Sequence, residues 1–271
     1  MNKVIITSLK ESLTLIWKSK LIFILLFFLQ IIFFISFSLI SYNYTPKIIE
    51  SQKAIYEYVS NLKQDEISIA EDILQQKNIL GEDPLLITRN FNEIVKNFKL
   101  YLTYIFILLV IFTSISWTIT FRLIYGKMFL PLAKTSFILL FYLGLIFLFF
   151  YSLFNISFNE IAVEGTKIFT KYIPFLIFSI ILIYFMFISL SLINKTELKE
   201  IVQKTLKIGI KKAHYILAAY FISILFFALS IFLLIYFIEK NLFILLLSII
   251  LLIFSFVFGR IFMVKVVERL D

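Results

Sequence analysis

The sequence predicts an all-α fold class, a polytopic integral membrane protein with six transmembrane helices. Composition, hydropathy and the placement of charge each indicate it. Of the 271 residues, 61% are hydrophobic and 16% are charged, whereas soluble domains are roughly half apolar and a quarter charged. The mean hydropathy is +1.00, so more side chains are apolar than a water-soluble core of this size can enclose. A soluble enzyme and a disordered chain are both excluded.

The predicted spans follow from uncharged apolar runs. A helix needs about 20 such residues to cross roughly 30 Å of hydrocarbon. Membrane barrels instead alternate apolar and polar residues, and these runs are apolar on every side, so helices are expected. Six runs without Asp, Glu, Lys or Arg meet the length requirement: 21–40, 100–121, 135–159, 172–194, 213–238 and 241–259.

Charge placement predicts the orientation of the helices, because segments near the cytoplasm carry an excess of Lys and Arg. With the N-terminus inside, the inner segments hold 16 basic and five acidic residues, and the outer segments hold 10 and 12. We therefore expect a multi-pass protein of the cell membrane with both termini cytoplasmic. The net charge of +9 then reflects topology and an inner surface facing anionic membrane lipids. No nucleic-acid partner is expected, since no motif of that class accompanies the charge.

The segments 1–20 and 195–212 are predicted to be cytoplasmic amphipathic helices in the headgroup layer. Leu9, Leu13, Ile16 and Trp17 recur at helical spacing in the first segment, and a similar apolar stripe runs along the second. Lysine stems can cover apolar surface while their ammonium groups reach water and lipid phosphates. The lysines expected to bind anionic lipid headgroups are Lys10, Lys18, Lys20, Lys199, Lys204, Lys207, Lys211 and Lys212.

Residues 122–136 read as a third, degenerate copy of this amphipathic pattern, in which Pro131 restricts the helix. Each copy precedes two spans, so the chain is predicted to consist of three hairpin units. In each unit an inner interfacial helix leads to a span, an outer connection and a span back. All units begin on the same side, unlike the inverted repeats of many transporters. The alternative is that any membrane hairpin protein places basic amphipathic segments inside.

Residues 42–99 are predicted to be an extracytoplasmic helical-hairpin insertion within a single membrane domain that covers residues 1–271. Apolar residues at three-four spacing predict one helix from Pro46 to about residue 79, with Pro46 in its first turn. A second helix is expected to follow the turn at 81–84 and run into the second span. The narrow apolar stripe either packs within the hairpin or receives a helix from a protein partner.

The sequence offers little for catalysis. It has no Cys and one His, which removes disulfides, thiolate metal sites, cysteine nucleophiles and imidazole clusters. It also lacks an HExxH motif and a Gly-rich phosphate loop. We therefore expect no enzyme activity, no cofactor and no bound metal. Glu160 and Glu164, one helical turn apart, could hold a cation or be solvated loop carboxylates, and His214 could be a ligand or a surface side chain.

Uncharged polar side chains are the polar groups expected inside the spans. Enzymes that act within membranes use ionisable residues facing a cavity, so an intramembrane hydrolase is disfavoured. Serine hydroxyls in helices commonly bond to the backbone of their own helix, which is the expectation here. The polar residues in question are Gln30, Ser36, Ser38, Ser114, Ser116, Asn155, Ser157, Ser179 and Ser223.

The pattern over the whole chain resembles a known group of proteins. Trp17 and Lys18 precede the first span, a basic amphipathic segment at 197–212 precedes the fifth, and Arg260 follows the last. In this the chain resembles six-span bacterial and archaeal proteins similar to the membrane domain of glycerophosphodiester phosphodiesterases. In that group the membrane domain is sometimes fused to a catalytic phosphodiesterase domain, which is not expected in these residues. The resemblance implies the architecture and no catalytic residue.

Two functions are compatible with these features. The first is a non-catalytic scaffold or accessory subunit, whose inner helices bind anionic lipid headgroups and whose 42–99 hairpin meets a partner outside. The second is a transporter or permease subunit for an apolar or lipid-like substrate. A separate ATPase that docks on residues 199–212 could supply the energy for transport. Aromatic side chains that line a transport path cannot be separated from lipid-facing ones by sequence.

Overall fold

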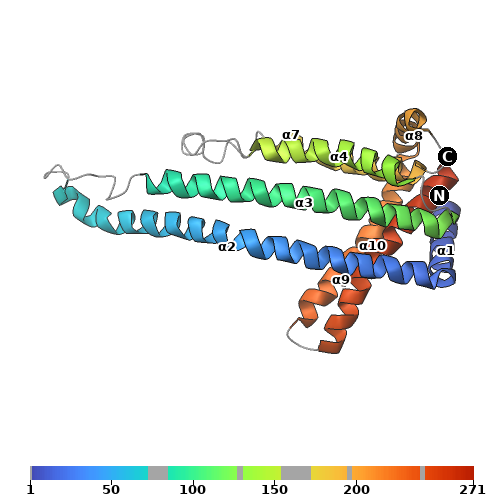
Figure 1. Cartoon of the computed structure of the whole chain (residues 1–271), viewed down its shortest axis with the longest axis horizontal. Coiled ribbons are helices and arrows are strands. Elements are labelled where there is room, and N and C mark those ends of the chain that lie inside the picture. Colours follow the sequence, from blue (N-terminus) through green and yellow to red (C-terminus); the bar gives the residue numbers. More distant parts are fainter. Residues whose placement is uncertain (1, 73–84, 127–130, 154–171, 194–196, 239–241) are drawn as a thin grey trace. The chain divides into compact units, whose positions relative to one another are not determined.

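The computed structural model describes residues 2–72, 85–126, 131–153, 172–193, 197–238 and 242–271. Within these ranges it has eight helices and no strand, and six of the helices are long and apolar enough to cross a membrane. Over their described residues, the six predicted spans are confirmed as helical. The helices are α1 (Asn2–Lys18), α2 (Lys20–Asp72), α3 (Leu86–Tyr125), α4 (Pro131–Leu153), α7 (Ile173–Leu192), α8 (Leu198–Lys211), α9 (Ala213–Phe237) and α10 (Leu242–Leu270) (Figure 1).

The chain divides into two compact units. Unit 1 comprises Met1–Ile35, Leu108–Ile146 and Leu176–Asp271, and unit 2 comprises Ser36–Ile107 and Phe147–Phe175. Unit 1 therefore contains all of α1, α8, α9 and α10.

The core of unit 1 is built around the C-terminal half of α10. α9 packs along α10, and α1 packs against both helices (Figure 1). Three rings on one face of α10 stack in sequence, with centroids 5.8 Å apart for Phe254 and Phe258 and 5.6 Å apart for Phe258 and Phe262. The other fully buried residues of this half of α10 are Val257, Ile261, Val264, Val266 and Val267.

Unit 2 has aromatic contacts between its helices. The Tyr44 and Tyr104 rings stack with centroids 5.7 Å apart, and Ser41 and Tyr101 share a hydrogen bond of 3.1 Å between their hydroxyl oxygens. These contacts join α2 to α3 near the start of the predicted 42–99 insertion. The predicted turn at 81–84 lies outside the described residues, so packing within the hairpin stays a prediction.

The predicted helix start at Pro46 is wrong. α2 is continuous from Lys20 to Asp72 and contains Pro46 in its interior. Proline is common in the first turn of a helix because it has no N–H group to leave unbonded. The sequence therefore favours a helix start at Pro46. Inside a helix it removes one backbone hydrogen bond, and the long flanking stretches of α2 preserve the helix on both sides of that gap.

The degenerate third copy of the amphipathic pattern is not a separate helix among its described residues. Residues 122–125 form the last turn of α3, which ends before Gly126 at a φ of +74°. Pro131 is the first residue of α4, where its fixed φ favours a helix start. Residues 127–130 lie outside the described part of the chain.

The segments predicted to be amphipathic at the two other entries are helices with one buried face. In α8 the buried residues are Ile201, Thr205, Ile208 and Gly209, and Tyr184 of α7 donates a hydrogen bond of 2.7 Å to the Gly209 carbonyl. In α1 the packed face includes Ser8, Ser12 and Ile16, whereas Leu13 and Trp17 are exposed. Their position at the cytoplasmic headgroup layer stays a prediction.

Candidate functional site

The eight lysines predicted to bind lipid headgroups lie on or beside α1 and α8. Six of them are exposed: Lys10, Lys18, Lys20, Lys199, Lys207 and Lys211. The other two are partly buried and reach the C-terminal end of α10. Lys204 forms an ion pair of 3.2 Å with Asp271, and the Lys212 ammonium donates to the Leu270 carbonyl.

Further polar contacts surround the same end of α10. Glu268 accepts a hydrogen bond from the Tyr125 hydroxyl of α3 and an ion pair of 2.7 Å from Lys265, one turn earlier. Arg269 pairs with Glu11 of α1. This cluster, Tyr125–Lys265–Glu268, joins α3 to α10. The side chains of Lys265 and Glu268 are largely buried, so removing either one would leave the other as an unpaired buried charge.

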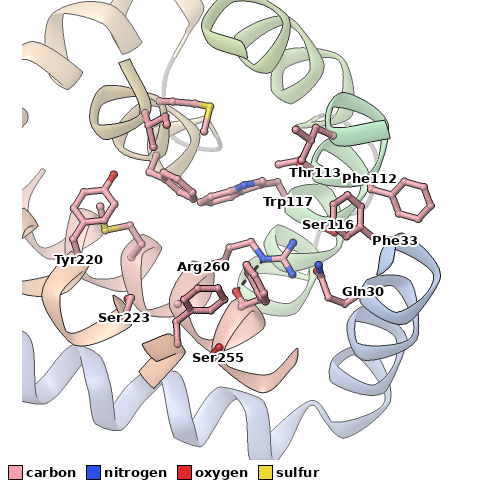
Figure 2. A pocket seen from close by; sticks show the side chains of 18 of the residues that line it. Gln30, Phe33, Phe112, Thr113, Ser116, Trp117, Tyr220, Ser223, Ser255 and Arg260 are labelled. Carbon is pink, nitrogen blue, oxygen red and sulfur yellow. Dashed lines mark hydrogen bonds between the residues drawn. The ribbon is translucent and has the colours of Figure 1, made fainter. Parts of the chain in front are cut away.

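A cavity of about 510 Å³ lies inside unit 1, and all of its lining residues belong to that unit. Helices α2, α3, α4, α7, α9 and α10 contribute to its walls. Most of the lining is apolar, from side chains such as Leu109, Ile183, Met186 and Phe227. The uncharged polar residues that line it are Gln30, Thr113, Ser116, Tyr220, Ser223 and Ser255 (Figure 2).

Arg260 is the only charged side chain that lines this cavity within the described residues. Its Nε atom donates to the Phe256 carbonyl at 3.4 Å, a long contact within its own helix. Its Nη2 atom is buried without a hydrogen-bond partner in the described part of the protein. In Figure 2 the guanidinium points toward Gln30 of α2. An ionised donor with so little compensation is costly unless another group satisfies it.

Arg260 follows the last predicted span without a break in the helix. α10 continues past residue 259 to Leu270, so Arg260 is an interior residue of the helix. The uncharged run ended at Gly259 because Arg260 itself ended it. Because each predicted span ends before the first charged residue, this criterion could not predict that Arg260 lines a cavity within the helix bundle.

Trp117 is a second residue of the cavity wall with a buried donor. Its indole is fully buried on α3, and its Nε1 atom has no hydrogen-bond partner among the described residues. The ring packs against Phe121 and Phe187 with centroid distances of 5.7 and 6.1 Å. The indole N–H can donate but cannot accept.

The serines expected to bond within their own helices do so only in part. Ser223 donates to the Ala219 carbonyl at 3.0 Å, as expected. Ser114 instead receives a hydrogen bond of 3.1 Å from Ser136 of α4, which joins two helices. Asn155 and Ser157 lie outside the described residues.

The remaining candidates for chemistry are Glu160, Glu164 and His214. Glu160 and Glu164 lie outside the described residues, so neither alternative for them is tested. His214 is exposed beside Tyr215, with ring centroids 4.2 Å apart. Among the residues that the structure describes, no group of three or more His, Cys, Asp or Glu side chains could hold a metal ion.

No protein-family model, no curated protein and no solved structure matches the chain. The resemblance to the membrane domain of glycerophosphodiester phosphodiesterases therefore stays a prediction. The site has to be interpreted from its own geometry.

Proposed function

We propose that this chain is a multi-pass membrane protein that binds an apolar or lipid-like molecule in the cavity of unit 1, as a transporter or permease subunit. The observation that carries the proposal is the cavity itself. Its volume of about 510 Å³ falls within the roughly 300–1,000 Å³ typical of small-molecule sites. Apolar walls with few convergent polar groups are also typical of such sites.

The proposal includes a topology and a role. Three hairpin units would place both termini in the cytoplasm of the cell, with the basic helices α1 and α8 on that side. The cavity-lining residues offer a binding surface without a paired acid and base, so the role proposed is binding and movement of the molecule without covalent chemistry.

Tryptophan fluorescence tests the proposal, because the chain has two Trp residues. Trp17 is exposed and Trp117 is buried in the cavity wall. In a Trp17→Phe variant in nanodiscs, a brominated monoacylglycerol should quench the remaining Trp117 saturably. Quenching that only rises in proportion to the probe, as for bulk lipid, would contradict the proposal.

A matched pair of substitutions on α3 separates the cavity from the protein surface. Thr113 lines the cavity, whereas Ile111, two residues earlier, is exposed and does not line it. Thr113→Phe in the Trp17→Phe background should fill part of the cavity and weaken saturable quenching. Ile111→Phe should leave the quenching unchanged. Equal effects of the two substitutions would count against a site in the cavity.

Headgroup binding by a scaffold or accessory subunit is a second candidate function, favoured by the exposed face of α8. Lys199, Lys207 and Lys211 are exposed together with Val202 and Leu206, a combination suited to an anionic membrane surface. The 42–99 hairpin would then meet a protein partner outside.

Lipid retention during purification tests this second function. Replacing Lys199, Lys207 and Lys211 by Gln should lower the amount of anionic phospholipid that co-purifies in mild detergent, as measured by mass spectrometry. The control replaces Lys47, Lys53 and Lys96, which belong to the segment predicted to be outside. An equal loss in both variants would contradict headgroup binding by α8.

A further inference from the structure

Two donor groups in the cavity wall lack an acceptor. The Nη2 atom of Arg260 and the Nε1 atom of Trp117 are both buried, and neither has a hydrogen-bond partner among the described residues. Guanidinium and indole nitrogens can only donate. Whatever satisfies both groups must therefore bring acceptor atoms into the cavity.

We propose that the cavity binds a single-chain anionic amphiphile, with Arg260 and Trp117 holding its carboxylate or phosphate head and the apolar walls holding its chain. This rests on the proposed function and names the class of molecule that the same cavity takes. A planar guanidinium matches the oxygen pair of a carboxylate or phosphate in a bidentate arrangement. The amphiphile would supply the negative charge that the lining lacks, since Arg260 is its only charged member among the described residues.

The cost of burying a charge favours this reading over a structural role for Arg260. An ionised side chain within a membrane protein usually pairs with an opposite charge or marks a ligand path. Here the described protein supplies only the long Nε contact to Phe256. Other charged residues of the same helix are paired, as in the contacts of Lys265 with Glu268 and of Arg269 with Glu11. Arg260 thus differs from its neighbours in facing a cavity instead of a carboxylate.

The arrangement along the helices separates a head region from a chain region. On α3 the lining runs from Leu109 and Phe112 to Ser116 and Trp117, a distance of about 12 Å along a helix. The Trp117 donor thus lies toward the C-terminal end of this stretch, and Leu109 and Phe112 lie toward its beginning. Gln30, which the Arg260 guanidinium faces in Figure 2, can offer its amide to the same head.

The affinities of matched probes for Trp117 test the inference. The Trp17→Phe variant in nanodiscs is titrated with a brominated fatty acid, a brominated alkyl phosphate and a brominated monoacylglycerol of the same chain length. Both anionic probes should bind roughly 10- to 100-fold more tightly than the neutral one, as a charge-assisted hydrogen bond provides. Equal affinities for all three probes would overturn the inference and leave the proposed function standing.

Variants of Arg260 test whether this side chain causes the preference for anionic over neutral probes. Arg260→Gln should remove the anionic preference, so that the three probes bind with similar affinity, and saturable quenching by the neutral probe reports that the cavity still forms. Arg260→Lys keeps the charge without the planar fork and should retain an intermediate preference. Lys207→Gln, on the exposed face of α8, should change nothing. An undiminished preference in both Arg260 variants would overturn the assignment.

Competition by small anions distinguishes an amphiphile from a free anion. Inorganic phosphate and acetate, which lack a chain, should fail to displace the brominated alkyl phosphate at millimolar concentration. Displacement by either would overturn the amphiphile and indicate a site for free anions. Absence of saturable quenching by every probe, the neutral one included, would be a failure of the proposed function itself.

Discussion

The two parts of α10 are both mostly apolar, but they have different surroundings. From Leu242 to about residue 252 the helix has no charge, and large side chains such as Phe243, 74% exposed, lie on the surface. From Ile253 to Leu270 most apolar side chains are buried, and this part holds all four charged residues of α10, Arg260, Lys265, Glu268 and Arg269. The more apolar part of this helix is the exposed one, so high hydropathy does not mark the part that packs against protein.

The largest expected difference between the halves comes from removing one ring in each. Phe258→Ala should lower the free energy of unfolding by about 3 kcal/mol, because it deletes a fully buried ring that stacks on two others. Phe243→Ala should lower it by less than about 1 kcal/mol, since an exposed ring loses few protein contacts. Unfolding in mixed detergent micelles, followed by circular dichroism, measures both. Equal losses would mean that the two halves do not differ in packing.

A smaller effect is expected at the Tyr125–Lys265–Glu268 cluster. Glu268→Ala removes the acceptor of the Tyr125 hydroxyl and leaves Lys265 buried beside it, which should cost about 2 kcal/mol of unfolding free energy. Adding Tyr125→Phe to Glu268→Ala should lower the unfolding free energy little further, because the Tyr125 hydroxyl has already lost its acceptor. Fully additive losses in the same unfolding assay would show that the hydroxyl and the carboxylate contribute independently.

The smallest effects extend the comparison to glycines in other helices. A Cβ at Gly209 of α8 would lie 2.6 Å from Phe185 Cε1, whereas a Cβ at Gly144 of α4 would meet nothing within 4 Å. Gly209→Ala should lower the unfolding free energy by about 1 kcal/mol through overpacking. Gly144→Ala should raise it by about 0.5–1 kcal/mol through helix propensity. A stabilising Gly209→Ala would show that the contact between α7 and α8 is loose.

The spans were predictable from sequence because crossing a membrane imposes a local requirement. Each needs a long uncharged run, which can be counted along the chain. The ends of the helices were less predictable. α2 passes through Pro46, and α10 continues past Arg260. A long helix can continue through one missing backbone hydrogen bond or one charged residue when the packing around it is favourable.

The cavity could not have been predicted in the same way. Its walls come from six helices, and Gln30, Ser116 and Arg260 are far apart in sequence. Ser116 looked like any other serine in a span, and Arg260 looked like the boundary of one. A charge within a turn of a span's apparent end is the signal that could have pointed to the site, because such a residue can turn into the bundle as readily as into water.

The ties between α10 and earlier helices have a consequence for biogenesis. Arg269 pairs with Glu11, 258 positions earlier, and Glu268 binds Tyr125, 143 positions earlier. During synthesis, Glu11 and Tyr125 cannot form these contacts until residues 268 and 269 have left the ribosome. A nascent chain stalled within α10 would therefore lack both contacts that tie this helix to α1 and α3.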